Sequence, residues 1–141
     1  MSFDLERFVD AQRGAYPGVL WELRAGHKSN HWIWFIFPQI AGLGSSATSR
    51  LYAIGSLEEA RSYLAHPILG PRLRECATTL LTVPDRSAAD ILGRIDAMKL
   101  GSSMTLFLRA APDEVVFREV LDRFFDGLAD PATDARLAGA V

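Results

Sequence analysis

The sequence predicts an all-α fold, namely a compact single domain built as a bundle of roughly seven to nine short helices. Three observations predict it. Apolar residues recur three and four positions apart along most of the chain, which is the period of an amphipathic helix. Signals that start or stop helices separate these stretches. The alternation of apolar and polar residues that marks β-strands is nearly absent.

The first half of the chain contains three predicted helices with clear boundaries. Apolar residues recur at helical spacing over residues 5–12. Pro17 opens the next helix, because proline fits the first helical turn, and Gly26 is a natural residue just past its end. The third helix begins with the capping-box pattern Ser-x-x-Glu at residues 56–59 and runs to Leu64.

Four more helices are predicted in the second half. A long apolar face begins after Pro67 and reaches Pro84. A short helical turn follows Ser87, which is a favourable N-cap residue. The strongest amphipathic pattern of the chain covers residues 113–125, and a last weak helix begins at Pro131.

The composition is that of an ordinary globular domain. The chain has 141 residues, of which 49% are hydrophobic and 23% charged, with a net charge of -2. A chain of this length normally folds as one domain and buries roughly two-thirds of the surface that its unfolded form exposes. We therefore expect residues 1–141 to form a single domain, with the residues after about 128 as a weakly ordered tail.

Cysteine content, charge and hydropathy bear on location and partners. Cys76 is the single cysteine, and the first residues lack a signal-peptide pattern, so we expect a cytoplasmic protein. No apolar run approaches the roughly 18 residues of a membrane span, so no membrane partner is expected. Basic residues are spread among acidic ones, which argues against nucleic acid as a partner. The oligomeric state is left open, with a monomer favoured.

The segment Lys28–Gln39 differs from ordinary helical surface. Four aromatic residues lie within residues 32–37, and Pro38 follows them. One interpretation is a central helix that is apolar on all sides because other helices surround it. It does not explain the polar residues 28–31, which would donate hydrogen bonds near a helix start. Backbone amides and the helix dipole favour a phosphate or carboxylate at such a place.

The segment Asp96–Phe107 is the second unusual one, because glycine, two serines and a threonine interrupt an apolar stretch. One interpretation is a close crossing of helices, with the hydroxyl groups bonded to carbonyls one turn back. The other is a helix start that faces a ligand. Lys99 would then hold a phosphate, whereas the structural alternative pairs it with Asp96 on the same helix face.

Catalytic and metal-binding patterns are scarce. His27 and His31 are four positions apart, but no third zinc ligand is evident and no metal site is expected. Cys76 lies on a helical apolar face, which is typical of a buried, inert thiol. His31 is the one general base that these segments offer, and Asp96 is the residue that would orient it or act beside it. Whether the protein is an enzyme is left open, and no cofactor is identified.

Six motifs carry a resemblance to a known family. They are His-Trp-x-Trp-Phe-x-Phe-Pro-Gln at 31–39, Gly-Leu-Gly-Ser-Ser-Ala at 42–47, Tyr-Ala-Ile at 52–54, Glu-Ala-x-x-Tyr-Leu-x-His-Pro at 59–67, Leu-Gly-x-Arg-Leu at 69–73 and Lys-Leu-x-Ser-Ser-Met-Thr-Leu-Phe at 99–107. From about Phe3 to Phe125 the chain resembles the DUF1810 (Rv1873-like) family. The resemblance implies a compact all-helical single domain and implies no function, since family members are mostly described as uncharacterised bacterial proteins. The label calpastatin, which some relatives carry, does not suit a chain with a clear core pattern.

The resemblance makes the first and the last of these motifs family hallmarks, and their polar residues are not needed for a helical core. We expect a pocket lined by the segments His31–Gln39 and Asp96–Phe107 that binds a small anionic metabolite of the nucleotide or nucleotide-sugar type. Two lysines would contact phosphate, and a tryptophan would stack on the ligand. The expected ligand-binding residues are Lys28, His31, Trp32, Trp34, Gln39, Lys99, Ser102, Ser103 and Thr105.

An alternative function belongs to a different class. The chain would be a protein-interaction or assembly module in which the two hallmark segments only define the fold. Core aromatic residues and polar helix caps are common roles that account for the same residues. An exposed apolar face on the helix over residues 116–125 would then be the docking surface.

Overall fold

The computed structural model describes residues 3–139, which form ten helices and one isolated β-bridge. The helices are α1 (Glu6–Gln12), α2 (Tyr16–Ala25), α3 (Ile33–Ile36), α4 (Ala47–Leu51), α5 (Leu57–Ala65), α6 (Leu69–Leu81), α7 (Ala88–Leu92), α8 (Arg94–Ala110), α9 (Val115–Phe125) and α10 (Pro131–Leu137). The all-α prediction is confirmed, and the number of helices is slightly above the predicted range. The unexpected helix is α4, whose N-cap Ser46 accepts a hydrogen bond from the backbone N–H of Ser49 at 3.1 Å.

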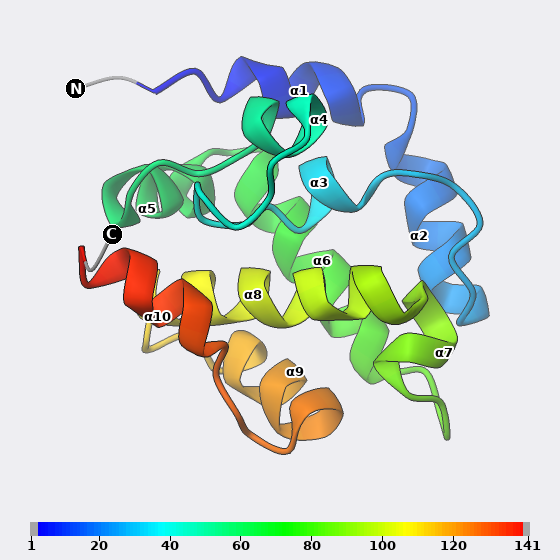
Figure 1. Ribbon diagram of the computed structural model, residues 1–141. Helices are drawn as coiled ribbons and strands as arrows, with labels where there is room; N and C mark the ends of the chain where they lie inside the picture. Colours follow the sequence, from blue (N-terminus) through cyan, green and yellow to red (C-terminus); the bar gives the residue numbers. More distant parts are fainter. Residues whose placement is uncertain (1–2, 140–141) are drawn as a thin grey trace.

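Helix α8 is the central element, packed against α3, α5, α7, α9 and α10. Figure 1 shows it crossing the middle of the molecule, with α1, α3, α4 and α5 on one side, α9 on the other and α10 beside its C-terminal end. Three of its large side chains, those of Leu100, Met104 and Phe107, are fully buried. The helix has 17 residues, and neither it nor any other helix within residues 3–139 is long and apolar enough to cross a membrane.

The expectation of a central helix over residues 32–37 is wrong in its extent. Helix α3 is a single turn, Ile33–Ile36, and Phe37 leaves the helical conformation with φ -123° and ψ 73°. Pro38 is the reason, because its ring disfavours the helical conformation in the residue that precedes it. The aromatic segment is nevertheless well packed, since Trp32, Ile33, Ile36 and Phe37 are all buried.

A row of aromatic rings joins helices that are distant in sequence. Phe8 of α1 meets Tyr63 of α5 edge to face with ring centroids 5.1 Å apart. Tyr63 contacts Phe107 of α8 at 5.4 Å, and Phe107 contacts Phe117 of α9 at 5.8 Å. Pairs of this kind contribute roughly 0.5–1.5 kcal/mol beyond the burial of their area. The row therefore ties both sides of the domain to α8.

The predicted start of α5 is confirmed, with one difference in its capping interactions. Ser56 accepts a hydrogen bond from the backbone N–H of Glu59 at 3.1 Å, as a capping box requires. The Glu59 carboxylate does not return to Ser56. It accepts a hydrogen bond from the backbone N–H of Gly55 at 2.8 Å and forms an ion pair with Arg7 of α1 at 2.9 Å. A local cap thus also serves as a tertiary link.

Helix α9 uses its apolar face inside the domain. Phe117, Val120 and Leu121 are fully buried, and α9 packs against α6 and α8. The part of the expected docking surface that these three residues form is therefore covered by the domain itself, whereas Val116, Phe124 and Phe125 of the same face are partly buried.

The segment after residue 128, which the sequence predicts to be a weakly ordered tail, contains α10 alongside α8. Asp130 caps this helix by accepting hydrogen bonds from the backbone N–H and the hydroxyl of Thr133, at 3.1 and 2.6 Å. Arg109 of α8 and Asp134 of α10 form an ion pair at 2.9 Å. Residues 140–141 of the predicted tail lie outside the described residues.

Candidate functional site

The candidate site lies beside the segment 38–56, which connects α3 to α5 and carries α4. The bridge between Ile40 and Ile54 closes this segment into a loop. The backbone N–H of Ala41 donates to the carbonyl of Ile54, and the N–H of Ile54 donates to the carbonyl of Gln39, each at 2.8 Å. The loop is thereby held at both ends, which fixes the place of the side chains that line it.

Two glycines let this loop turn tightly. Gly42 has φ +98°, a conformation that strains any residue with a side chain, and a Cβ there would meet the guanidinium group of Arg136 from α10. A Cβ on Gly44 would lie 2.6 Å from the Cβ of Ser49. The Gly-Leu-Gly motif is therefore required by close approach of α10 and α4, and it leaves space in front of the loop.

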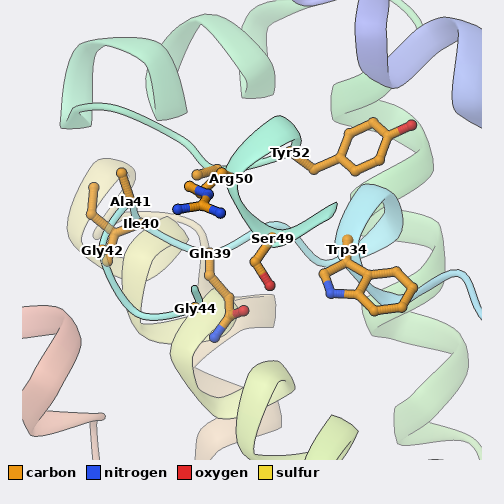
Figure 2. Close-up of a pocket in the computed structure, with 10 residues that line it drawn as sticks. Trp34, Gln39, Ile40, Ala41, Gly42, Gly44, Ser49, Arg50 and Tyr52 are labelled. Atoms are coloured by element: carbon orange, nitrogen blue, oxygen red, sulfur yellow. The ribbon is translucent and has the colours of Figure 1, made fainter. Parts of the chain in front are cut away.

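A first pocket, here called the Trp34 pocket, has a volume of about 100 Å³. Its lining includes the side chains of Trp34, Gln39, Ser49 and Arg50, each of which carries a hydrogen-bond donor. Figure 2 shows the indole nitrogen of Trp34 on the edge of the ring that faces Ser49 and Gln39. This N–H is buried and has no hydrogen-bond partner within residues 3–139. A buried donor without a partner is rare in folded proteins and marks this pocket.

A second pocket, here called the Lys99 pocket, has a volume of about 260 Å³ and shares Gln39 and Gly44 with the first. Lys99 and Ser102 of α8 line it, together with Asp130 at the start of α10. The two hallmark segments therefore meet in space, at Gln39 from one and at Lys99 and Ser102 from the other. The volume approaches the lower end of the roughly 300–1,000 Å³ that is typical of small-molecule sites.

Lys99, which lines the Lys99 pocket, also contacts Trp34, which lines the Trp34 pocket. Its ammonium group lies over the Trp34 ring, 4.7 Å from the ring centroid, which is cation–π geometry. The nearest carboxylate is that of Asp96, 3.8 Å away. The predicted pairing of Lys99 with Asp96 along the helix is thus present at the outer limit of an ion pair.

Asp96 has a closer partner in Lys28. The two groups are 2.8 Å apart, and the Lys28 side chain is 7% exposed. The Lys28 ammonium also lies 5.2 Å from the ring centroid of Trp32. One carboxylate therefore faces two ammonium groups, and the cluster keeps a net positive charge on the side of Lys99.

The anion expected near residues 28–31 is supplied by the protein itself. The carboxylate of Glu22 from α2 accepts hydrogen bonds from the backbone N–H groups of Ser29 and Asn30, at 2.6 and 3.1 Å. It also accepts hydrogen bonds from the Asn30 amide at 2.7 Å and the Trp32 indole N–H at 3.0 Å. Burial raises the pKa of Glu22, but these hydrogen bonds lower it more, to about 2. The amides that the sequence assigned to a ligand are thus occupied by an internal carboxylate.

Three of the expected ligand-binding residues lie in the core and line neither the Trp34 pocket nor the Lys99 pocket. Trp32 is 3% exposed, and its N–H is used by Glu22. Thr105 is fully buried, donates to the carbonyl of Gly101 at 2.8 Å and accepts from the backbone N–H of Asp130 at 2.8 Å. Ser103 is fully buried, and its hydroxyl has no partner within residues 3–139. For the segment Asp96–Phe107, the surroundings of Ser103 and Thr105 agree with the interpretation of a close crossing of helices.

His31 and Asp96, the candidate catalytic residues, border a shallow depression outside the two pockets, and Lys28 and Trp34 line it with them. His31 is exposed, so it is open to solvent and is not positioned by a hydrogen bond within the described residues. The same range of the chain brings no three His, Cys, Asp or Glu side chains together at a geometry that would hold a metal ion.

Sequence reasoning missed Ser49, Arg50 and Glu22. Ser49 and Arg50 lie on α4, and the pattern Ser46-x-x-Ser49 was the signal for a capped helix after the glycines. Arg50 has no ion-pair partner within residues 3–139, so its charge is available to the Trp34 pocket. Glu22 lies on a predicted helix, but only the tertiary structure shows what its carboxylate reaches.

Comparisons with known proteins agree with the fold. The model of a family described as "Protein of unknown function (DUF1810)" matches residues 2–137. Among solved structures, the crystal structure of the conserved hypothetical protein Rv1873 from Mycobacterium tuberculosis is similar, with a TM-score of 0.95 and 51% sequence identity over 96% of this chain and 97% of that chain. No curated protein matches the chain. This chain belongs to the DUF1810 family.

Proposed function

We propose that this protein binds a small anionic metabolite in the Trp34 and Lys99 pockets, which together are called the double pocket below. The observation that carries the proposal is the buried indole N–H of Trp34, which lacks a protein partner and borders a pocket. Leaving a buried donor unpaired costs roughly 1–3 kcal/mol. A ligand oxygen that accepts this hydrogen bond recovers that cost, so the site favours a ligand with an acceptor at this position.

The charges around the double pocket support an anion over a cation. Arg50 and Lys99 can only donate hydrogen bonds, and Gln39 and Ser49 offer further donors. The nearest carboxylate of the pocket wall is that of Asp130, which already accepts hydrogen bonds from Ser102 and from two donors of Thr133. The donors are thus open to a ligand, while one oxygen of the acceptor is already used within the protein.

The expected nucleotide or nucleotide-sugar type of ligand is the first class to test. A phosphate or sugar oxygen would accept from Trp34, and the guanidinium group of Arg50 would contact the charge, since its planar donors suit phosphate and carboxylate. Trp34 contributes its N–H edge in this arrangement, because Lys99 covers one face of its ring. Lys28 and His31 lie at the neighbouring depression and are outside the proposed site.

The test is calorimetric titration with UMP, UDP-glucose, glucose 6-phosphate and inorganic phosphate, on the wild type and on Trp34→Phe. The substitution keeps an aromatic ring and removes the N–H, so a ligand that uses this donor loses about 5- to 150-fold in affinity. Trp21→Phe is the matched control, because Trp21 is 70% exposed on α2. Arg50→Gln should weaken binding further, and the weakening should shrink at high salt.

Melting temperatures of all variants are measured first, so that loss of binding is read only on folded protein. If Trp34→Phe and Arg50→Gln leave the affinity for the ligand unchanged, the ligand binds elsewhere and the proposal is overturned. The same holds if none of the anions binds to the wild type at millimolar concentration.

A further inference from the structure

A third hollow borders the double pocket on the side of α9. This third pocket, of about 290 Å³, shares Met98, Ser102 and Asp130 with the Lys99 pocket. The shared residues place the three hollows side by side from Trp34 to Leu128, and this row of hollows is here called the trough. Its two ends differ in chemistry, and that difference says what kind of molecule would lie along it.

The end at α9 carries exposed apolar side chains. Met98 and Leu128 are large apolar side chains that are 71% and 70% exposed, and Ile95, on the same helix face as Met98, is 71% exposed. Two polar groups at this end are already used within the protein. Ser102 donates to one carboxylate oxygen of Asp130 at 2.9 Å, and the same oxygen takes two further hydrogen bonds from its own helix start. The carboxylates of Asp126 and Asp130 repel an anion, so for an anionic ligand contact through methylene or aryl groups is the main favourable interaction there.

The charges orient a ligand along the trough. Arg50 and Lys99 lie toward the Trp34 end, and the Asp126 carboxylate lines the α9 end, while Asp130 lies between them and lines both the Lys99 pocket and the third pocket. An anionic group is attracted to the first end and repelled from the second.

We infer that the ligand is an amphiphilic organic anion, with its carboxylate or phosphate head at Arg50 and Lys99 and an apolar tail along Met98 and Leu128. This inference rests on the proposed function and names the class of ligand for the same site. The trough is open to solvent along the exposed side chains, so about half of each methylene group is buried. That corresponds to a gain in affinity of about twofold per methylene.

The experiment measures binding of inorganic phosphate and of ethyl, butyl, hexyl and octyl phosphate to the full chain by calorimetry, below the concentration at which the probes aggregate. Alkanoates of two to eight carbons form the second arm, which distinguishes a carboxylate head from a phosphate head. We expect affinity to rise with tail length in at least one arm. Leu128→Gln and Met98→Gln should flatten the rise, while Leu51→Gln, a change of an exposed leucine outside the trough, should not.

The outcomes separate this inference from the proposed function. If short anions bind through Trp34 and Arg50 but tail length and Leu128→Gln have no effect, the amphiphilic class is wrong and the anion site stands. If UMP binds more tightly than octyl phosphate, the amphiphilic class is also wrong and the anion site again stands. If no probe of any length binds, both fail. Binding that appears only above the aggregation concentration also overturns the inference.

Discussion

Glu22 offers the sharpest test of how this fold is held near the candidate site. Its carboxylate is 5% exposed and accepts four hydrogen bonds from the segment 29–32. In Glu22→Gln the charge is lost, and the amide NH₂ of the new side chain faces donors instead of acceptors. We therefore expect a loss of stability together with a local loosening of Trp32.

The magnitude follows from the pKa of this carboxyl group. The pKa is about 2 in the folded protein against an ordinary value of 4.5, because the hydrogen bonds from Asn30, Ser29 and Trp32 outweigh the effect of burial. One pKa unit corresponds to about 1.4 kcal/mol, so the ionised carboxylate contributes about 3 kcal/mol to the free energy of unfolding. The contribution is fully present above the ordinary pKa and is lost as the pH falls toward the folded value. Roughly 1.4 kcal/mol is already lost at about pH 3.5.

The assay is urea unfolding of the wild type and Glu22→Gln at pH 7, 5.5 and 3.5, followed by circular dichroism. We expect a difference of about 3 kcal/mol at pH 7 that narrows at pH 3.5. Glu119→Gln is the control, since Glu119 is exposed on α9, and it should change stability by less than about 0.5 kcal/mol. A difference at pH 7 below about 1 kcal/mol, or one that does not depend on pH, would refute the role assigned to Glu22.

Three further predictions use other contacts. Arg7 bonds the carbonyls of Leu51 and Ala53 and pairs with Glu59. Arg7→Gln should therefore cost about 2–3 kcal/mol in urea unfolding, against less than about 0.5 for Arg13→Gln, whose ion pair is exposed. Gly42→Ala should lower stability by about 1–2 kcal/mol, because φ is +98° and Arg136 occupies the space, whereas Gly18→Ala in α2, with open space, should raise it by about 0.5 kcal/mol. Equal effects of the two glycine changes in thermal melts would contradict this. Burial raises the pKa of the Cys76 thiol to about 12, so a thiol reagent at pH 8 should label it only in urea, and rapid labelling of folded protein would show that α6 opens.

Helix α3 and its N-cap residue Trp32 serve both the fold and the proposed function. Trp32 and Trp34 are two positions apart, and residues at that spacing point to different sides of a helical turn. Trp32 therefore enters the core and donates to Glu22, while Trp34 turns toward the pocket and Lys99. One short aromatic motif thus supplies both a structural anchor and the donor on which the proposed function depends.

Membership of the family means that the proposed function can also be tested on a relative. The match to the DUF1810 family covers residues 2–137, so the double pocket lies entirely within the matched region. Both hallmark segments line it, the first with Trp34 and Gln39 and the second with Lys99 and Ser102. A ligand found for this chain would therefore be the first to try on Rv1873, which is 51% identical.

The local sequence determined most of the helices of this protein. Apolar spacing and caps act within one or two turns, and for that reason α5, α6, α7 and α9 begin and end close to the predicted residues. The same local rules account for the hydroxyl groups of Ser102 and Thr105, which bond carbonyls one turn back. Helix α4 was missed because its five residues are too few to show a periodic face.

Only the tertiary structure decided which polar residues face a ligand. Lys28 and Lys99 look alike in sequence, yet Lys28 is neutralised by Asp96 at 2.8 Å while Lys99 lies over Trp34. The amides before α3 looked open to an anion, and Glu22 occupies them. The physical reason is that hydrogen bonds and charges are satisfied by whatever group the packed chain brings within about 3 Å, and the distance along the chain does not encode that choice.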